Sequence, residues 1–145
     1  MQDTDRSGTV LVVDDEPDLA DLYEIWLSPQ YDVRTAYGGQ QALDELDQAV
    51  DVALLDRRMP GRSGEEVAER IVQIAPETAI AFVSSEADPT VRSGVQYDAY
   101  LTKPVDRSAL LELVAALLDP PDERVPVPGA PGESRRGPAS SPDRW

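Results

Sequence analysis

Short apolar runs alternate along the chain with longer stretches whose apolar residues recur at helical spacing. The runs are rich in β-branched and leucine residues, as is typical of strands that are buried on both faces of a sheet. We expect five such strands, at residues 9–14, 32–36, 51–56, 78–84 and 99–102.

The stretches between these runs predict five helices. The first begins near Pro17, because proline suits a first helical turn, and ends at Ser28. The second carries one apolar face, formed by Ala42, Leu43, Leu46 and Ala49. The others are expected after Gly64, as a short helix over 88–95, and after an Asp106 cap.

Regular alternation of strands and helices favours right-handed crossovers and a parallel sheet covered on both faces. The fold class is therefore three-layer α/β, in a single domain. Residues 120–145 are rich in proline and poor in apolar side chains, so they predict a disordered tail, and 1–7 predict a flexible N-terminus.

Acidic residues outnumber basic ones by 28 to 13, which gives a net charge of -15. This charge repels nucleic acids and anionic membranes, so a direct nucleic-acid or membrane partner is not expected. It is typical of adaptation to a high-salt cytoplasm, and an ordinary acidic protein is the alternative. Without cysteine or histidine, the chain lacks thiolate chemistry and most zinc sites. No signal peptide or membrane span is evident, so we expect a cytoplasmic protein.

Polar residues follow the carboxyl ends of the predicted strands, and in a parallel sheet we expect these ends to lie at one edge. Asp14 and Asp15 follow the first strand, and Asp56 follows the third. Ser84 ends the fourth strand, and Lys103, the only lysine in the chain, follows the fifth. A compact ammonium beside several carboxylates indicates a site for Mg²⁺ and a phosphoryl group.

The charges themselves favour this chemistry. Two carboxylates about 5 Å apart repel by roughly 3 kcal/mol at an effective dielectric near 20, so three together require a cation or a raised pKa. Aspartate carboxylates also act as phosphoryl nucleophiles, which makes Asp56 the candidate acceptor. The Ser84 hydroxyl and Lys103 ammonium are placed to hold the transferred oxygens.

Four motifs resemble the receiver domain of response regulators over about residues 8–118. They are Val12-Val-Asp-Asp-Glu16, Leu54-Leu-Asp-Arg-Arg-Met-Pro-Gly-Arg-Ser-Gly64, Val83-Ser-Ser85 and Tyr100-Leu-Thr-Lys-Pro104. The resemblance implies a receiver domain over 8–119, with a flavodoxin-like (βα)5 fold and parallel strand order 2-1-3-4-5.

The resemblance also implies roles at the acidic edge. Asp56 would be the phosphoacceptor, and Asp15 and Asp56 would bind the Mg²⁺ cofactor directly. The backbone carbonyl of Arg58 would complete the protein ligands, with Asp14 acting largely through water.

Further roles fall on the last two strands. Ser84 and Lys103 would contact the phosphoryl group, and Tyr100 would reorient when Ser84 moves toward it. The Lys103–Pro104 peptide bond would be cis, an isomer found in about 5–6% of X-Pro bonds.

The implied function is that of a stand-alone phosphoacceptor, not an enzyme, which receives its phosphoryl group from a sensor histidine kinase or a histidine phosphotransfer protein. It would signal to an unidentified output protein, as a monomer or a phosphorylation-dependent dimer. The acidic surface and the stretch between Ser84 and Lys103, a few residues shorter than in most receivers, resemble haloarchaeal HalX-type regulators. Their C-terminal helical domain is expected to be missing, with the proline-rich segment in its place.

Two other functions stay open from the sequence. A phosphate-independent pseudo-receiver would serve only as a binding module, although the intact acidic and lysine set argues against it. An aspartate-nucleophile phosphatase of the haloacid-dehalogenase type needs a second aspartate where this chain has Arg58.

Individual residues have ordinary alternatives as well. Asp15 lies just before Pro17, and capping the first helix could be its only role. Tyr100 could be a core residue, and Ser85 could take the place of Ser84. Arg57 and Arg58 are interpreted as solvated loop charges.

Overall fold

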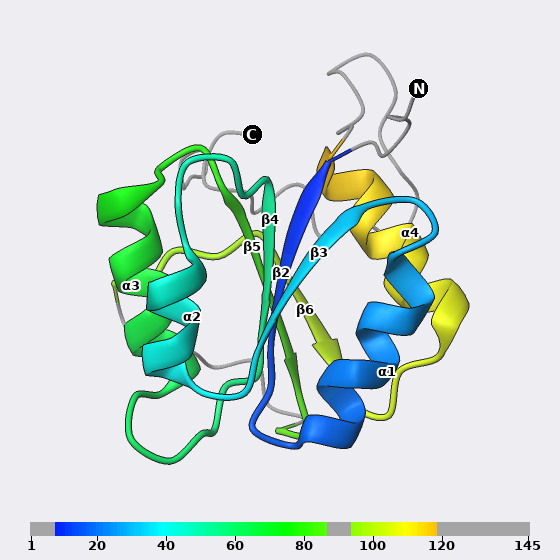
Figure 1. The fold of residues 1–145 in the computed structure, drawn as a ribbon. Coiled ribbons are helices and arrows are strands. Elements are labelled where there is room, and N and C mark those ends of the chain that lie inside the picture. The colour runs from blue at the N-terminus through cyan, green and yellow to red at the C-terminus, as the bar shows by residue number, and fades with distance from the viewer. Residues whose placement is uncertain (1–7, 87–93, 119–145) are drawn as a thin grey trace, which may run out of the picture.

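The computed structural model describes residues 8–86 and 94–118. Five strands and four helices lie in these ranges, and Figure 1 shows their arrangement. In chain order they are β2 (Thr9–Val13), α1 (Pro17–Leu27), β3 (Asp32–Ala36), α2 (Gly39–Glu45), β4 (Val52–Leu55), α3 (Gly64–Ile74), β5 (Ala79–Ser84), β6 (Ala99–Thr102) and α4 (Arg107–Leu118).

The strands form one sheet in the order β3-β2-β4-β5-β6, and every pair is parallel. In terms of the chain this is the order 2-1-3-4-5, so the predicted fold class and strand order are confirmed. β2 and β4 are neighbours at the centre, with Val13 opposite Leu55. The segments that follow these two strands therefore emerge side by side at one edge of the sheet.

Side-chain alternation along the strands builds the two faces of the sheet. In β2, Leu11 and Val13 point into a core shared with α2 and α3, while Val10 and Val12 point into a second core shared with α1 and α4. Figure 1 shows the sheet between these two helix pairs. Because both faces are buried at the centre of the sheet, β2, β4 and β5 are nearly continuous apolar runs, whereas the edge strand β3 carries Asp32, Arg34 and Thr35.

The helices begin where local chemistry favours it. Pro17 occupies the first turn of α1, as predicted. Ser63 and Glu66 form a reciprocal capping box at the start of α3, and the Asp106 side chain accepts a hydrogen bond from the Ala109 N–H at the start of α4. The predicted Asp106 cap is therefore confirmed.

The second helix is shorter than predicted. α2 ends at Glu45, and Leu46 has extended backbone angles, so the expected helical face through Leu46 and Ala49 is wrong. The Asp47 carboxylate accepts the Ala49 N–H at 2.8 Å and pairs with Arg34 at 3.1 Å. This local turn competes with helix continuation. Leu46 stays buried, whereas Ala49 is exposed.

Three expectations concern residues outside the described ranges. They are the flexible N-terminus at 1–7, most of the short helix over 88–95, and the disordered tail at 120–145. Among the helices that are described, none is long and apolar enough to cross a membrane.

Candidate functional site

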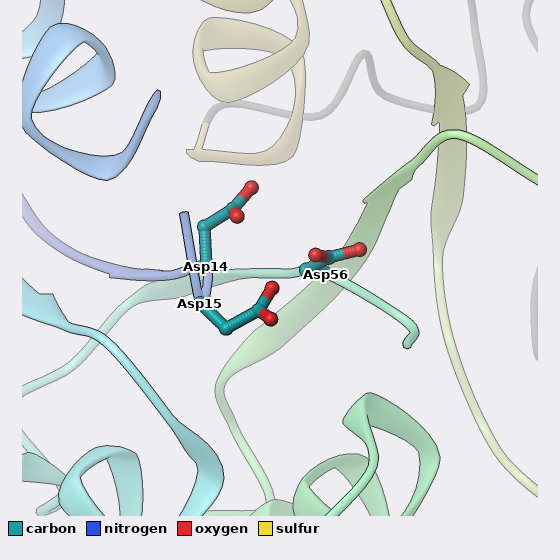
Figure 2. A group of neighbouring side chains, drawn as sticks. All are labelled: Asp14, Asp15 and Asp56. Carbon is teal, nitrogen blue, oxygen red and sulfur yellow. The ribbon is translucent and has the colours of Figure 1, made fainter. Parts of the chain in front are cut away.

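The acidic residues are placed by the two central strands. Asp14 and Asp15 follow β2, and Asp56 follows β4. Backbone bonding continues past the strand ends, since the Asp56 N–H donates to the Val13 carbonyl at 2.9 Å and the Asp14 N–H to Ala36 at 3.1 Å. The three side chains extend from these adjoining ends in Figure 2. The sheet register thus fixes their mutual position.

One carboxylate oxygen from each aspartate lies within 4.8 Å of the others. Asp14 and Asp56 are buried and Asp15 is half-buried, so the group forms a recessed, open-sided cluster. Three hard oxygen donors of this kind suit a hard divalent cation, which typically takes one or two carboxylates and keeps several waters. The residues present therefore fit Mg²⁺.

Asp56 has a strongly perturbed carboxyl group. Burial raises its pKa to about 6, and the charge of Asp14 adds to the effect. Lys103 acts in the opposite direction, while a hydrogen bond with Asp15 and its charge raise the pKa further. Negative charge on Asp56 is therefore destabilised by its surroundings unless a cation compensates.

Lys103 supplies a fixed cation to the cluster. Its Nζ lies 2.8 Å from Asp14 Oδ2 and 3.5 Å from Asp56 Oδ2. Burial acts to lower the pKa of the ammonium, but the hydrogen bond to Asp14 and the charges of Asp56 and Asp14 raise it overall. The lysine therefore stays protonated. The Lys103–Pro104 peptide bond is cis, the isomer that the resemblance implies.

Two hydrogen bonds hold the Asp14 carboxylate. Asp14 accepts from Lys103 on one oxygen and from the Glu16 N–H on the other, at 2.9 Å. The N-cap of α1 is Glu16, and no side chain caps the helix. The interpretation of Asp15 as a helix cap is therefore wrong.

Ser84 lies fully buried at the end of β5, whereas Ser85 is exposed. The Ser84 Oγ accepts a hydrogen bond from the Glu86 N–H at 3.2 Å, and the Ser84 carbonyl accepts from the Lys103 N–H at 2.8 Å. β5 is thus tied to the segment that carries the lysine. Of the two serines, only Ser84 belongs to β5.

Tyr100 lies on β6, half-buried against the core that α2 and α3 cover. Its ring centroid is 6.1 Å from that of Phe82 and 6.4 Å from that of Tyr97. Its hydroxyl donates to the Glu86 carbonyl at 2.8 Å. Tyr100 therefore packs against the core, as a core residue would, and its hydroxyl also makes a polar contact with the loop after β5.

The interpretation of Arg57 as a solvated loop charge is wrong. Its side chain is only 11% exposed and lies 3.1 Å from Glu65, while Nη1 donates to the Tyr100 hydroxyl at 3.3 Å. These two hydrogen bonds, the Tyr100 one first, raise the pKa of the guanidinium although burial lowers it. Arg58 agrees better with the expectation, since its side chain is 72% exposed and pairs with Glu86 at 3.4 Å.

Gly64 is a second residue whose role the sequence did not indicate. Its N–H donates to the Arg57 carbonyl at 3.0 Å, which closes the loop after β4. A Cβ atom at this position would lie 2.1 Å from the Asp56 carbonyl oxygen. Only glycine therefore allows α3 to begin this close to the phosphoacceptor candidate.

Comparisons with known proteins agree with this geometry. Residues 10–115 match the family described as response regulator receiver domain. The chain is 46% identical over 110 residues to a Haloferax volcanii protein described as a candidate transcriptional regulator, and 37% identical over 127 residues to the response regulator protein PilR of Pseudomonas aeruginosa. The matches cover 75% and 81% of this chain but only 19% and 28% of those relatives.

Solved structures give the same result. A CheY-like receiver domain protein from Methanospirillum hungatei is 26% identical with a TM-score of 0.72, over 77% of this chain and 94% of that one. The response regulator TrrA from Thermotoga maritima, crystallised in complex with Mg²⁺-BeF, is 32% identical with a TM-score of 0.65, over 76% of this chain and 98% of that one.

Proposed function

The chain belongs to the family of response regulator receiver domains, and we propose that it accepts a phosphoryl group on Asp56 in the cytoplasm, with Mg²⁺ as cofactor. The donor would be a phosphohistidine of a sensor kinase or of a histidine phosphotransfer protein. The observation that carries the proposal is the convergence of three carboxylates and the Lys103 ammonium on one edge of the sheet.

In the proposed transfer, an Asp56 carboxylate oxygen forms a bond to phosphorus while the bond from phosphorus to the donor's imidazole nitrogen breaks. The nitrogen keeps the electron pair and takes up a proton. This chain contains no histidine, so the donor histidine belongs to the partner. The chain serves as acceptor and is not a classical enzyme, and the acidic surface disfavours nucleic acid as its direct target.

Each residue at the edge has a place in this chemistry. Asp15, Asp56 and the Arg58 carbonyl would hold Mg²⁺, with Asp14 acting through water. When bound, the cation would neutralise charge on the carboxylates and the phosphoryl oxygens. Lys103 would hold one transferred oxygen and Ser84 another. The Ser84 hydroxyl now accepts from the Glu86 N–H, so it would exchange that bond for the phosphoryl group.

The signal would leave through the β5–β6 side of the sheet. Movement of Ser84 would shift the segment at Glu86, whose carbonyl holds the Tyr100 hydroxyl. A new surface around Tyr100 would then bind an output protein, or a second copy of the chain.

The test uses small phosphoryl donors. Acetyl phosphate, and phosphoramidate with its phosphorus–nitrogen bond, should each add one phosphoryl group in Mg²⁺, as measured by intact mass. Chelation of Mg²⁺ should abolish the adduct.

The Asp56→Asn variant should gain no adduct. Asp44→Asn is a matched control, because Asp44 is an exposed carboxylate on α2, and it should label like the parent. A parent that stays unlabelled in Mg²⁺ would favour the phosphate-independent binding module. A full adduct on Asp56→Asn would instead show that the acceptor is another residue.

A further inference from the structure

Arg57 directly follows Asp56 in the chain and donates a hydrogen bond to Tyr100 on β6. We propose that Arg57, fixed by Glu65, is a positioning residue that holds the Tyr100 ring in its half-buried orientation. The functional meaning of that orientation rests on the proposed phosphoacceptor role of Asp56, but the contact itself does not.

The contacts form a continuous chain through four segments, which are the loop after β4, the start of α3, β6 and the segment after β5. Arg57 follows Asp56 at the end of β4, and its Nε lies 3.1 Å from Glu65 Oε2 in the first turn of α3. Its Nη1 donates to the Tyr100 hydroxyl at 3.3 Å, and that hydroxyl donates to the Glu86 carbonyl at 2.8 Å. The Tyr100 hydroxyl thus accepts a hydrogen bond from the loop after β4 and donates one to the segment after β5.

The pair that anchors the guanidinium is shielded from water. The Arg57 and Glu65 side chains are 11% and 17% exposed. Screening is therefore weaker than for a surface ion pair, and the planar fork keeps its orientation when one nitrogen is engaged. With Nε directed at Glu65, Nη1 is held ready for the phenol.

Rotation of the Tyr100 ring away from this position would break both of its hydrogen bonds. Loss of one bond from a charged donor changes an equilibrium by roughly tenfold or more. Arg57 should therefore set the population of the half-buried orientation independently of Ser84. Because it is covalently adjacent to Asp56, it gives the acceptor strand a direct link to Tyr100.

Aromatic NMR can measure the population. The NOE between Tyr100 and Phe82, normalised to the NOE between Tyr97 and Phe82, reports the ring position, since the two ring pairs lie 6.1 Å and 5.4 Å apart. Three-bond couplings of Tyr100 give its χ1 rotamers. The Tyr97 reference also shows that the core is folded.

Three variants separate the contact from general effects of charge. Arg57→Met keeps an unbranched apolar stem without donors, and Arg57→Lys keeps the charge without the fork. Arg70→Met is the matched control, because Arg70 is exposed on α3 and bonds Gln73 instead. Arg57→Lys also serves if Arg57→Met folds poorly, since it leaves a cation beside Glu65.

We expect both Arg57 variants to lose at least half of the normalised NOE and to show averaged couplings, while Arg70→Met matches the parent. Parental values in both Arg57 variants would overturn the proposal, and so would an equal loss in Arg70→Met. Labelling by acetyl phosphate on the same samples tests the proposed function separately, because an unlabelled parent leaves the NOE comparison intact.

Discussion

Replacing Asp56 by asparagine should stabilise the metal-free protein, which is unusual for a buried site residue. The pKa of this carboxyl is raised to about 6 from an ordinary 3.8, chiefly by burial and then by Asp14. Between these pH values the folded protein keeps a proton that the unfolded chain has released. Stability therefore falls as the pH rises through this window, and it stays lower above it.

The magnitude follows from the same two values. A tenfold change in a protonation equilibrium is worth about 1.36 kcal/mol, so an ionised Asp56 costs folding about 3 kcal/mol near neutral pH. At about pH 4.5 the cost falls to about 1 kcal/mol, because the folded protein is then protonated. Asp56→Asn, which is always neutral, should recover these amounts.

Mg²⁺ should reduce the difference in the free energy of unfolding between the parent and Asp56→Asn. A ligand that binds only the folded state at about 100 times its dissociation constant stabilises by about 2.7 kcal/mol. The parent keeps the full carboxylate set and should gain this, whereas Asp56→Asn should gain less.

Urea unfolding followed by circular dichroism, at about pH 4.5 and 7.5 with EDTA or Mg²⁺, measures these differences. Asp44→Asn controls for loss of one charge from a chain of net charge -15. If Asp56→Asn gains no more than Asp44→Asn at pH 7.5 in EDTA, the charge-repulsion argument fails.

Three other perturbations test the site and the surface. Asp15→Asn should weaken Mg²⁺ binding by tenfold or more in calorimetry, because a hard cation needs the charged ligand, and unchanged affinity would contradict the ligand set. The melting temperature should rise from dilute buffer to molar KCl as like charges are screened, and a flat trend would remove the high-salt interpretation. Gly64→Ala should cost about 2 kcal/mol or more in urea unfolding, because its Cβ meets the Asp56 carbonyl at 2.1 Å, and a cost near zero would mean that the loop yields freely.

The strands were predictable because both faces of the sheet are buried. A segment such as Val10 to Val13 must then be apolar at every position, which distinguishes it from an amphipathic helix. The strand order is a different matter. Alternation of elements requires only parallel crossovers, and the 2-1-3-4-5 order came from the motifs at Asp15, Asp56 and Lys103, not from the apolar pattern.

The end of α2 shows where periodicity fails. Leu46 and Ala49 continue the spacing of Ala42, so the pattern alone predicts a longer helix. What ends it is a polar contact, the Asp47 carboxylate on the Ala49 N–H. Leu46 still reaches the core from an extended backbone, so apolar spacing identified a buried residue but assigned it the wrong local structure.

The acidic cluster could be located from the sequence because the carboxyl ends of parallel strands lie at one edge of the sheet, and the strand order that the resemblance implies makes β2 and β4 neighbours. The same rule gives no side-chain contacts. It could not show that Lys103 pairs more closely with Asp14, at 2.8 Å, than with Asp56, at 3.5 Å. Those distances depend on the turn after β6, which no periodic pattern describes.

The sequence carries a signal that the Arg57 side chain is covered. Side chains in β4 alternate, and Ala53 and Leu55 point into the core beneath α3. Continuing this period for two residues places Arg57 on the same face, whereas Arg58 falls on the other. A charge on a covered face needs a partner, and Glu65 and Tyr100, 8 and 43 positions away, provide it. A strand's alternation thus persists beyond its last ladder residue, and a charged residue there should be assigned to a face before it is interpreted as solvated.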